Sequence, residues 1–172
     1  MEGQVAGEAE GKAGLDFGEP LTNVELERMV KGRRGPGGFR GIFMRDQLAE
    51  LPDPRPNTGY ILNTDLSSGP GKHWVGLHVA KGRAFYYDPY GKGAMAEARA
   101  FARRAGLPLT ASRQKHQHNR SQHCGRYVLE FLKAMRRPGD PMANFTAFTT
   151  EAFTPGAEEK NNGKIRKLYQ LA

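Results

Sequence analysis

The sequence of 172 residues has a single cysteine, Cys124, and a single tryptophan. One cysteine cannot form a disulfide within the chain, and it argues against a zinc module built from several thiolates. No window approaches the roughly 18 consecutive apolar residues that a membrane-spanning helix requires. The first residues also lack the apolar stretch of a signal peptide. We therefore expect a soluble protein, with no membrane partner, that starts in a reducing compartment.

The composition is that of a globular chain. The hydrophobic share is 38%, with nine Phe and six Tyr, and the length suits one domain with a substantial core. Residues 1–19 are rich in Gly, Ala and Glu, which predicts a flexible N-terminal tail. Residues 20–172 contain no internal repeat and are expected to form a single domain.

Hydrophobic patterns predict an α+β fold. His73–Ala80 and Ala84–Asp88 alternate as strands around Lys81-Gly82, which indicates a hairpin, and a helical pattern runs from Cys124 to about Arg137. The order predicts a central, mostly antiparallel sheet packed against a central helix with Cys124 at its N-terminus. The other expected elements are a helix from about Thr22 to Lys31, strands at Phe39–Phe43, Tyr60–Thr64 and Leu109–Ser112, a helical turn at Arg45–Leu51, and helices at Ala94–Ala105 and near Lys164–Leu171.

Cys124 lies in a setting that suits a nucleophile. A thiol at a helix N-terminus is favoured as the thiolate by the positive end of the helix dipole. His73 and Asp88 lie upstream and supply the residue types of a base and an orienting carboxylate. If Lys81-Gly82 is a two-residue loop, Asp88 lies diagonal to His73 across the hairpin, with Cβ atoms within about 7–8 Å. These residues predict a cysteine protease.

The tetrahedral intermediate of such a reaction needs hydrogen-bond donors. The main-chain amide of Cys124 and the side-chain amide of Gln117 are the candidates. Each residue also has a plainer explanation: a small buried thiol, a core histidine, an aspartate in a turn, a polar loop residue. Their agreement across compatible elements favours the catalytic interpretation.

The excess of basic residues suggests that the protein binds a polyanion. The formal net charge is +8 and the pI is about 9.8. Residues 99–137 hold ten Lys and Arg against Glu130 alone, a local net charge of +9. Such a field attracts polyanions, nucleic acid first, although a solvated basic surface is the alternative. The candidate nucleic-acid contacts are Arg103, Arg104, Arg113, Lys115 and Arg120.

Taken in order, these motifs resemble the adenovirus protease (adenain) family, viral cysteine proteases related to the enzymes that deconjugate ubiquitin-like proteins. The matching segments are Gly71–Trp74, Tyr87–Gly91, and Gln117 followed by Asn119, Ser121 and Cys124-Gly125, with weaker similarity at Phe39–Phe43 and Lys167–Tyr169.

The resemblance implies an adenain-like, papain-like arrangement in which His73 is the base, Asp88 the carboxylate, Gln117 the oxyanion donor and Cys124 the nucleophile. It further implies cleavage of viral precursor proteins during particle maturation, in the virion and the host nucleus. Adenoviral members are activated by DNA and by a peptide disulfide-linked to a second cysteine. This chain has no second cysteine. We therefore expect no disulfide-linked peptide cofactor, and we retain non-specific DNA as a partner and possible activator.

Three alternatives remain at this stage. A deconjugating protease for ubiquitin-like modifiers, an intracellular soluble enzyme, would share the catalytic order. A metal-dependent nucleic-acid-binding protein is suggested by His116, His118, His123 and Cys124, although their spacing is poor for tetrahedral zinc. A non-catalytic basic capsid protein is the third. For the protease we expect no cofactor in the chemistry itself, no metal, and a monomer.

Overall fold

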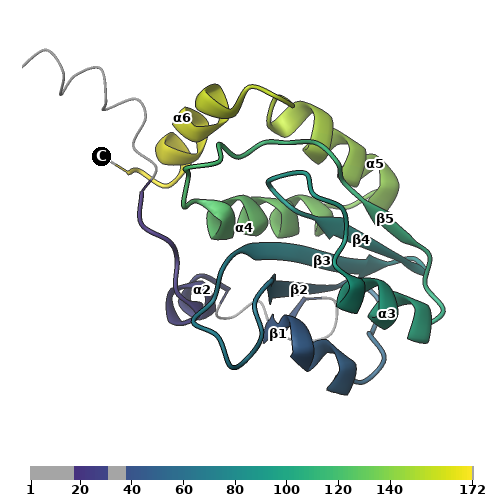
Figure 1. Ribbon diagram of the computed structural model, residues 1–172. Helices are drawn as coiled ribbons and strands as arrows, with labels where there is room; N and C mark the ends of the chain where they lie inside the picture. Colours follow the sequence, from purple (N-terminus) through teal and green to yellow (C-terminus); the bar gives the residue numbers. More distant parts are fainter. Residues whose placement is uncertain (1–17, 31–37, 172) are drawn as a thin grey trace, which may run out of the picture.

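The computed structural model describes residues 18–30 and 38–171 (Figure 1). Within these ranges, five strands form one sheet in the order β1-β2-β3-β4-β5, and helices cover both faces. The predicted α+β class is confirmed, whereas nearly all of the predicted flexible tail lies outside the described residues. The strands are β1 (Phe39–Met44), β2 (Thr58–Asn63), β3 (Trp74–Ala80), β4 (Arg83–Tyr87) and β5 (Leu109–Ala111).

The sheet is mixed, which corrects the prediction of a mostly antiparallel one. Strand β3 pairs antiparallel with both β2 and β4. The edge strands β1 and β5 instead run parallel to β2 and β4. Parallel neighbours need a crossover connection, and here the chain passes through η1 (Arg45–Glu50) on one side and α3 (Ala96–Arg104) on the other. Alternation of side chains reveals a strand but carries no information about the direction of its partner.

Two cores lie on opposite faces of the sheet. One face packs against α4 (Cys124–Met135), α5 (Pro141–Ala147), the π-helical segment η2 (Phe148–Ala152) and α6 (Glu158–Leu168). The other face packs against α3 and η1. Helix α4 lies close to β3 because Gly76 has no side chain: an added Cβ would lie 2.6 Å from the ring of Phe131. This close packing fixes the position of Cys124 relative to the sheet.

Most predicted elements are present, with small shifts at their ends. Helix α2 (Asn23–Val30) begins with a capping box: the Thr22 amide donates to the Glu25 carboxylate at 2.8 Å, and the Glu25 amide donates to the Thr22 hydroxyl at 3.2 Å. Its predicted end at Lys31 lies outside the described residues. Helix α5 and η2 were not predicted, although Asp140 before Pro141 is a helix-start signal. No helix among the described residues has the length and apolar character needed to cross a membrane.

Candidate active site

Cys124 is the first residue of α4 and is nearly buried, with 6% of its surface exposed. The predicted helix start is therefore confirmed. The helix stays in place because its apolar residues, Tyr127, Val128 and Phe131 among them, are buried against the sheet. The thiol thus sits at the positive end of a twelve-residue helix whose first N–H groups have no intrahelical partners.

The β3–β4 hairpin brings His73 and Asp88 together. Ala80 pairs with Arg83 across the Lys81-Gly82 loop, as predicted. His73 lies just before β3 and Asp88 just after β4, and His73 Nε2 is 2.7 Å from Asp88 Oδ1. The carboxylate is buried at the end of the sheet. The contact predicted from the hairpin register is present.

The electrostatic environment favours a charged imidazole at His73. Burial by itself lowers the pKa of His73, but hydrogen bonds to Asp88 and to Cys124, with the negative charges of both, raise this pKa to about 9. Because Nε2 is bound to Asp88, Nδ1 is the ring nitrogen left for the thiol. His73 is therefore an imidazolium at neutral pH, with Nδ1 available to the Cys124 sulfur.

Gln117 lies on the loop before α4 and is fully buried. Its Nε2 donates to the Ser121 carbonyl at 2.8 Å, which leaves the second N–H of that amide for another acceptor. The main-chain amides of His116 and Gln117 both donate to the Pro89 carbonyl, at 2.9 and 3.0 Å. The turn that carries Asp88 is thereby tied to the loop that carries Gln117.

A cleft of about 680 Å³ reaches Cys124. This volume is typical of pockets that bind ligands. Its walls are formed by the start of α2, the end of β1, the β2–β3 loop and Trp74. The Trp74 indole N–H donates to the Leu21 carbonyl at 2.8 Å, which holds the segment before α2 against the site. The lining residues are Pro20–Asn23, Glu27, Ile42–Met44, Gln47, Asn63, Ser67, Gly69–Lys72, Trp74, Gln122 and Cys124.

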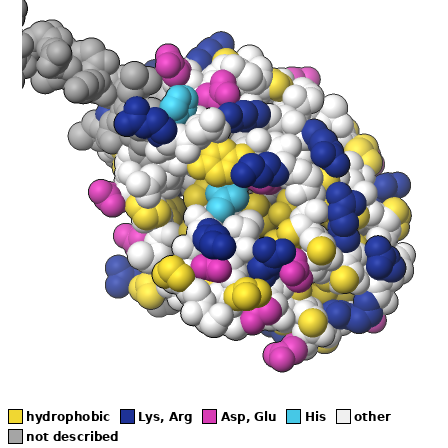
Figure 2. All heavy atoms as spheres, viewed as in Figure 1, with side chains coloured by type: hydrophobic (Ala, Val, Ile, Leu, Met, Phe, Trp, Pro, Cys, Tyr) yellow, Lys and Arg dark blue, Asp and Glu magenta, His cyan; other side chains and the backbone are white. Residues whose placement is uncertain are grey.

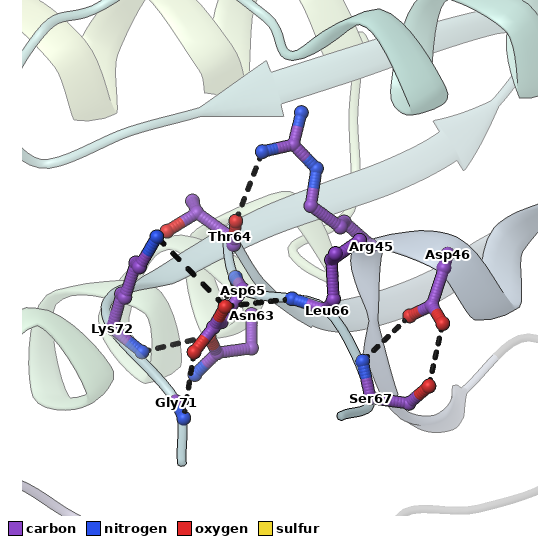
Figure 3. A network of polar contacts seen from close by, with 9 residues as sticks. All are labelled: Arg45, Asp46, Asn63, Thr64, Asp65, Leu66, Ser67, Gly71 and Lys72. Atoms are coloured by element: carbon purple, nitrogen blue, oxygen red, sulfur yellow. Dashed lines mark hydrogen bonds and ion pairs between the residues drawn. The ribbon is translucent and has the colours of Figure 1, made fainter. Parts of the chain in front are cut away.

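The β2–β3 loop is held by a polar network that sequence reasoning missed (Figure 3). The buried Asp65 carboxylate accepts from the amides of Leu66 at 2.9 Å and Gly71 at 3.0 Å. The Asn63 side-chain oxygen accepts from the amides of Asp65 at 2.9 Å and Lys72 at 3.0 Å. The loop folds around these two side chains and continues directly into His73. The sequence does contain a signal for this loop, because Asn63 and Asp65 stand close before Ser-Gly-Pro-Gly and all of these are turn-forming residue types.

The basic residues of 99–137 do not share one surface. Arg103 and Arg104 belong to α3, on the opposite face of the sheet from α4. Arg104 donates to the carbonyls of Leu48, Ala49 and Leu51, so it anchors the end of η1.

The loop before α4 carries the other named cations. Lys115 bonds the Asn119 side chain at 2.6 Å and pairs with Glu158 at 3.5 Å, whereas Arg113 and Arg120 are exposed. Figure 2 shows Lys and Arg side chains spread over one face with Asp and Glu among them. The basic sequence run is therefore divided between separate parts of the surface.

The metal-site alternative loses its support from His116. Its Nε2 lies 2.8 Å from the Thr149 carbonyl and its Nδ1 lies 2.8 Å from the Tyr87 hydroxyl. A carbonyl requires a donor, so Nε2 carries the proton and Nδ1 accepts from the tyrosine. Both ring nitrogens are thus occupied within the core. Among residues 18–30 and 38–171, no group of three or more His, Cys, Asp and Glu side chains is placed to hold a metal ion.

Comparison with known proteins finds solved structures of similar fold. No family model matches the chain, and no curated protein sequence does. A crystal structure of the pS273R protease of ASFV superposes with a TM-score of 0.63 at 18% identity, covering 86% of this chain and 66% of that protease. The central domain of Lpg1148, an uncharacterised Legionella pneumophila protein, superposes with a TM-score of 0.50 at 13% identity, covering 89% of this chain and 96% of that domain.

These likenesses concern the fold, because identity below one fifth does not by itself transfer a site or an activity. The chain spans about two thirds of the length of the ASFV protease that it resembles. The fold is therefore one that a viral protease uses.

Proposed function

We propose that the protein is a cysteine endopeptidase in which Cys124 is the nucleophile, His73 the general base and acid, and Asp88 the orienting carboxylate. The observation that carries the proposal is the 2.7 Å contact between His73 Nε2 and Asp88 Oδ1, together with Cys124 as the first residue of α4; the charge of Cys124 is among the causes that raise the pKa of His73. A cleft leads to the same thiol. This arrangement supports the assignment, because covalent acyl transfer needs a nucleophile, a base and an orienting group close together.

In the proposed reaction, the Cys124 thiolate attacks the peptide carbonyl and forms a carbon–sulfur bond. The resulting oxyanion accepts hydrogen bonds from the Cys124 amide and from the second N–H of the Gln117 side chain. His73 then gives its proton to the leaving amine, and the carbon–nitrogen bond breaks. Water, deprotonated by His73, attacks the thioester and releases the acid product and the thiolate.

We further propose that the substrates are viral precursor proteins cleaved during particle maturation, in the virion or the host nucleus. The support is the ordered set of motifs that resembles adenain, together with the fold likeness to a viral protease. A deconjugase would share the same triad. Viral-type peptides and ubiquitin-like modifiers with tail labels, offered side by side, distinguish the two by which one is hydrolysed.

The test of the protease proposal is an electrophilic peptide probe followed by mass spectrometry. The probe should label Cys124 in the wild-type protein and nothing in Cys124→Ala, which should have no hydrolytic activity and an unchanged circular dichroism spectrum. Cys124→Ser should be nearly inactive, because an alcohol is much harder to ionise than a thiol. Peptide cleavage by Cys124→Ala would overturn the nucleophile assignment.

We also propose that DNA binds without sequence preference to exposed basic residues. Support comes from the net charge of +8 and from the exposure of Arg103, Arg113 and Arg120. Phosphate contacts predict that log K falls linearly with log salt, with a slope of about −0.9 per phosphate neutralised on duplex DNA. Arg113→Ala with Arg120→Ala should reduce this slope, whereas Arg103→Ala reports on the opposite face of the sheet. A flat salt response in the wild-type protein would exclude the DNA proposal and leave the protease proposal untouched.

A further inference from the structure

We propose that Tyr90 is a positioning residue that links the catalytic base to the loop carrying the oxyanion donor. This inference rests on the proposed protease function. Tyr90 makes three separate contacts with that machinery: its ring with His73, its main chain with Asp88, and its hydroxyl with the loop before α4.

The first contact is a stack of two rings. The centroids of Tyr90 and His73 are 4.4 Å apart, and their planes are inclined by 22°. Asp88 binds the edge of the imidazole at Nε2, so the tyrosine restrains its face while the carboxylate restrains its rotation. The negative face of an aromatic ring also attracts a cation, so Tyr90 favours the imidazolium form of His73 over the neutral form.

The second contact holds the carboxylate. The Tyr90 amide donates to Asp88 Oδ1 at 2.8 Å, the same oxygen that binds His73. The turn is closed by the Gly91 amide, which donates to the Asp88 carbonyl at 2.8 Å, and Gly91 has a φ of +72°. A Cβ at Gly91 would lie 2.8 Å from the Arg113 carbonyl, so the turn is packed tightly against the segment after β5. The position of the Tyr90 side chain is therefore set by the backbone.

The third contact reaches the oxyanion loop. The Tyr90 hydroxyl donates to the Ser121 carbonyl at 3.3 Å, and that carbonyl also accepts from Gln117 Nε2 at 2.8 Å. One carbonyl thus links the tyrosine to the proposed oxyanion donor. Without Tyr90, the His73 imidazole and the Gln117 side-chain amide would no longer be held together through one residue. Their relative position would then change, and small errors in the placement of catalytic groups lower the rate strongly.

Two variants separate the ring from the hydroxyl. Tyr90→Phe keeps the aromatic face over His73 and removes only the hydroxyl, which contacts the Ser121 carbonyl at 3.3 Å and the Asn119 carbonyl at 3.4 Å. Tyr90→Leu keeps apolar cover over the imidazole and removes the aromatic face. Both variants retain an apolar side chain at that position, so comparing Phe with Leu reports on the aromatic face. Because Lys92 Nζ also lies 5.7 Å from the centroid of this ring, Lys92→Ala is the control that separates its contribution from that of His73.

The measurements are kcat and KM as a function of pH, and the titration of His73 by NMR. Tyr90→Leu should lower the pH at which His73 loses its proton by about 0.5–1 unit, and the alkaline limit of kcat should follow. Tyr90→Phe should leave that titration at its wild-type position and reduce kcat by about 3- to 30-fold with little change in KM. A merely structural role would alter thermal stability without moving the titration.

Identical His73 titrations in wild type and Tyr90→Leu would overturn the inference. If Tyr90→Leu does not fold, Tyr90→Phe decides: a wild-type kcat in that variant overturns it as well. Failure of the proposed function looks different, because wild-type protein would then show no probe labelling at Cys124 and no hydrolysis for either variant to modify.

Discussion

His73 and Asp88 are 15 positions apart in the sequence, and their side chains meet with Nε2 2.7 Å from Oδ1 at the open end of the β3–β4 hairpin. The two-residue loop at Lys81-Gly82 sets this meeting, because each step away from the loop pairs one residue of β3 with one of β4. Insertion of one residue into the loop would shift the register and turn one side chain to the other face of the sheet.

Replacing members of this pair should affect both rate and pH dependence. We expect His73→Ala to lower kcat by about 10²–10⁴-fold, as typical for a general base. Asp88→Asn should lower it less, because the imidazole remains but loses the charge that stabilises its protonated form. Since the pKa of His73 is raised to about 9, wild-type activity should decline as pH rises through about 9, and in Asp88→Asn this decline should begin at lower pH.

The exposed Asp53 provides a matched control for that experiment. Asp53→Asn removes the same charge at an exposed position outside the proposed catalytic residues and should leave the alkaline limit in place. A pH–rate profile of Asp88→Asn that coincides with the wild type would show that the carboxylate does not act on His73.

Gln117→Ala should impair the chemical step without impairing the thiol. We expect kcat to fall by about 10²–10³-fold, the usual cost of one lost oxyanion donor, while iodoacetamide alkylates Cys124 at nearly the wild-type rate. Gln114→Ala, in the same loop, serves as the matched control and should retain kcat. Loss of alkylation in Gln117→Ala equal to the loss of kcat would mean that the side chain supports the loop rather than the oxyanion.

Asp65→Ala should loosen one wall of the cleft. The change leaves the partly buried amides of Leu66 and Gly71 without their acceptor, which costs about 1–3 kcal/mol of unfolding free energy. We expect KM to rise several-fold with a smaller effect on kcat, measured by steady-state kinetics beside thermal denaturation. Asp46→Ala, which releases only the exposed Ser67 in the same loop, should have a weaker effect on KM and on thermal stability. A fall in kcat with unchanged KM would contradict the expectation that this wall of the cleft contacts the substrate.

His78 should make the fold sensitive to acid. Its ring is buried, neither nitrogen has a partner, and burial followed by the charge of Arg136 lowers its pKa from 6.5 to about 4. The unfolded chain then binds the additional proton between these values, so stability is complete above about pH 6.5 and falls as pH decreases toward 4. The loss should reach at most about 3 kcal/mol.

Chemical denaturation of wild type and His78→Phe across pH 4–8 measures this contribution. The difference between the two unfolding free energies should change with pH in favour of the variant as the solution becomes acidic, because Phe cannot take up a proton. The comparison cancels other acid-sensitive groups such as His116, whose pKa burial also lowers. A difference that stays constant across the range would show that His78 does not titrate with unfolding.

Local patterns in the sequence were enough to predict the hairpin, the start of α4 at Cys124, and the contact between His73 and Asp88. These features depend on periodicity, on a short turn and on counting along paired strands, all of which are properties of neighbouring residues. The capping box before α2 was predictable for the same reason: Thr22 and Glu25 satisfy each other's amides within one turn.

Only the tertiary structure decided how distant segments meet. The parallel pairing of β1 and β5 depends on crossover connections, and the separation of Arg103 from Arg113 depends on α3 packing on the opposite face from α4. Tyr90 likewise reaches His73 and Ser121 because the turn at Asp88 packs against the loop before α4. Contacts of this kind form when separate apolar surfaces are buried together, so no window of sequence contains them.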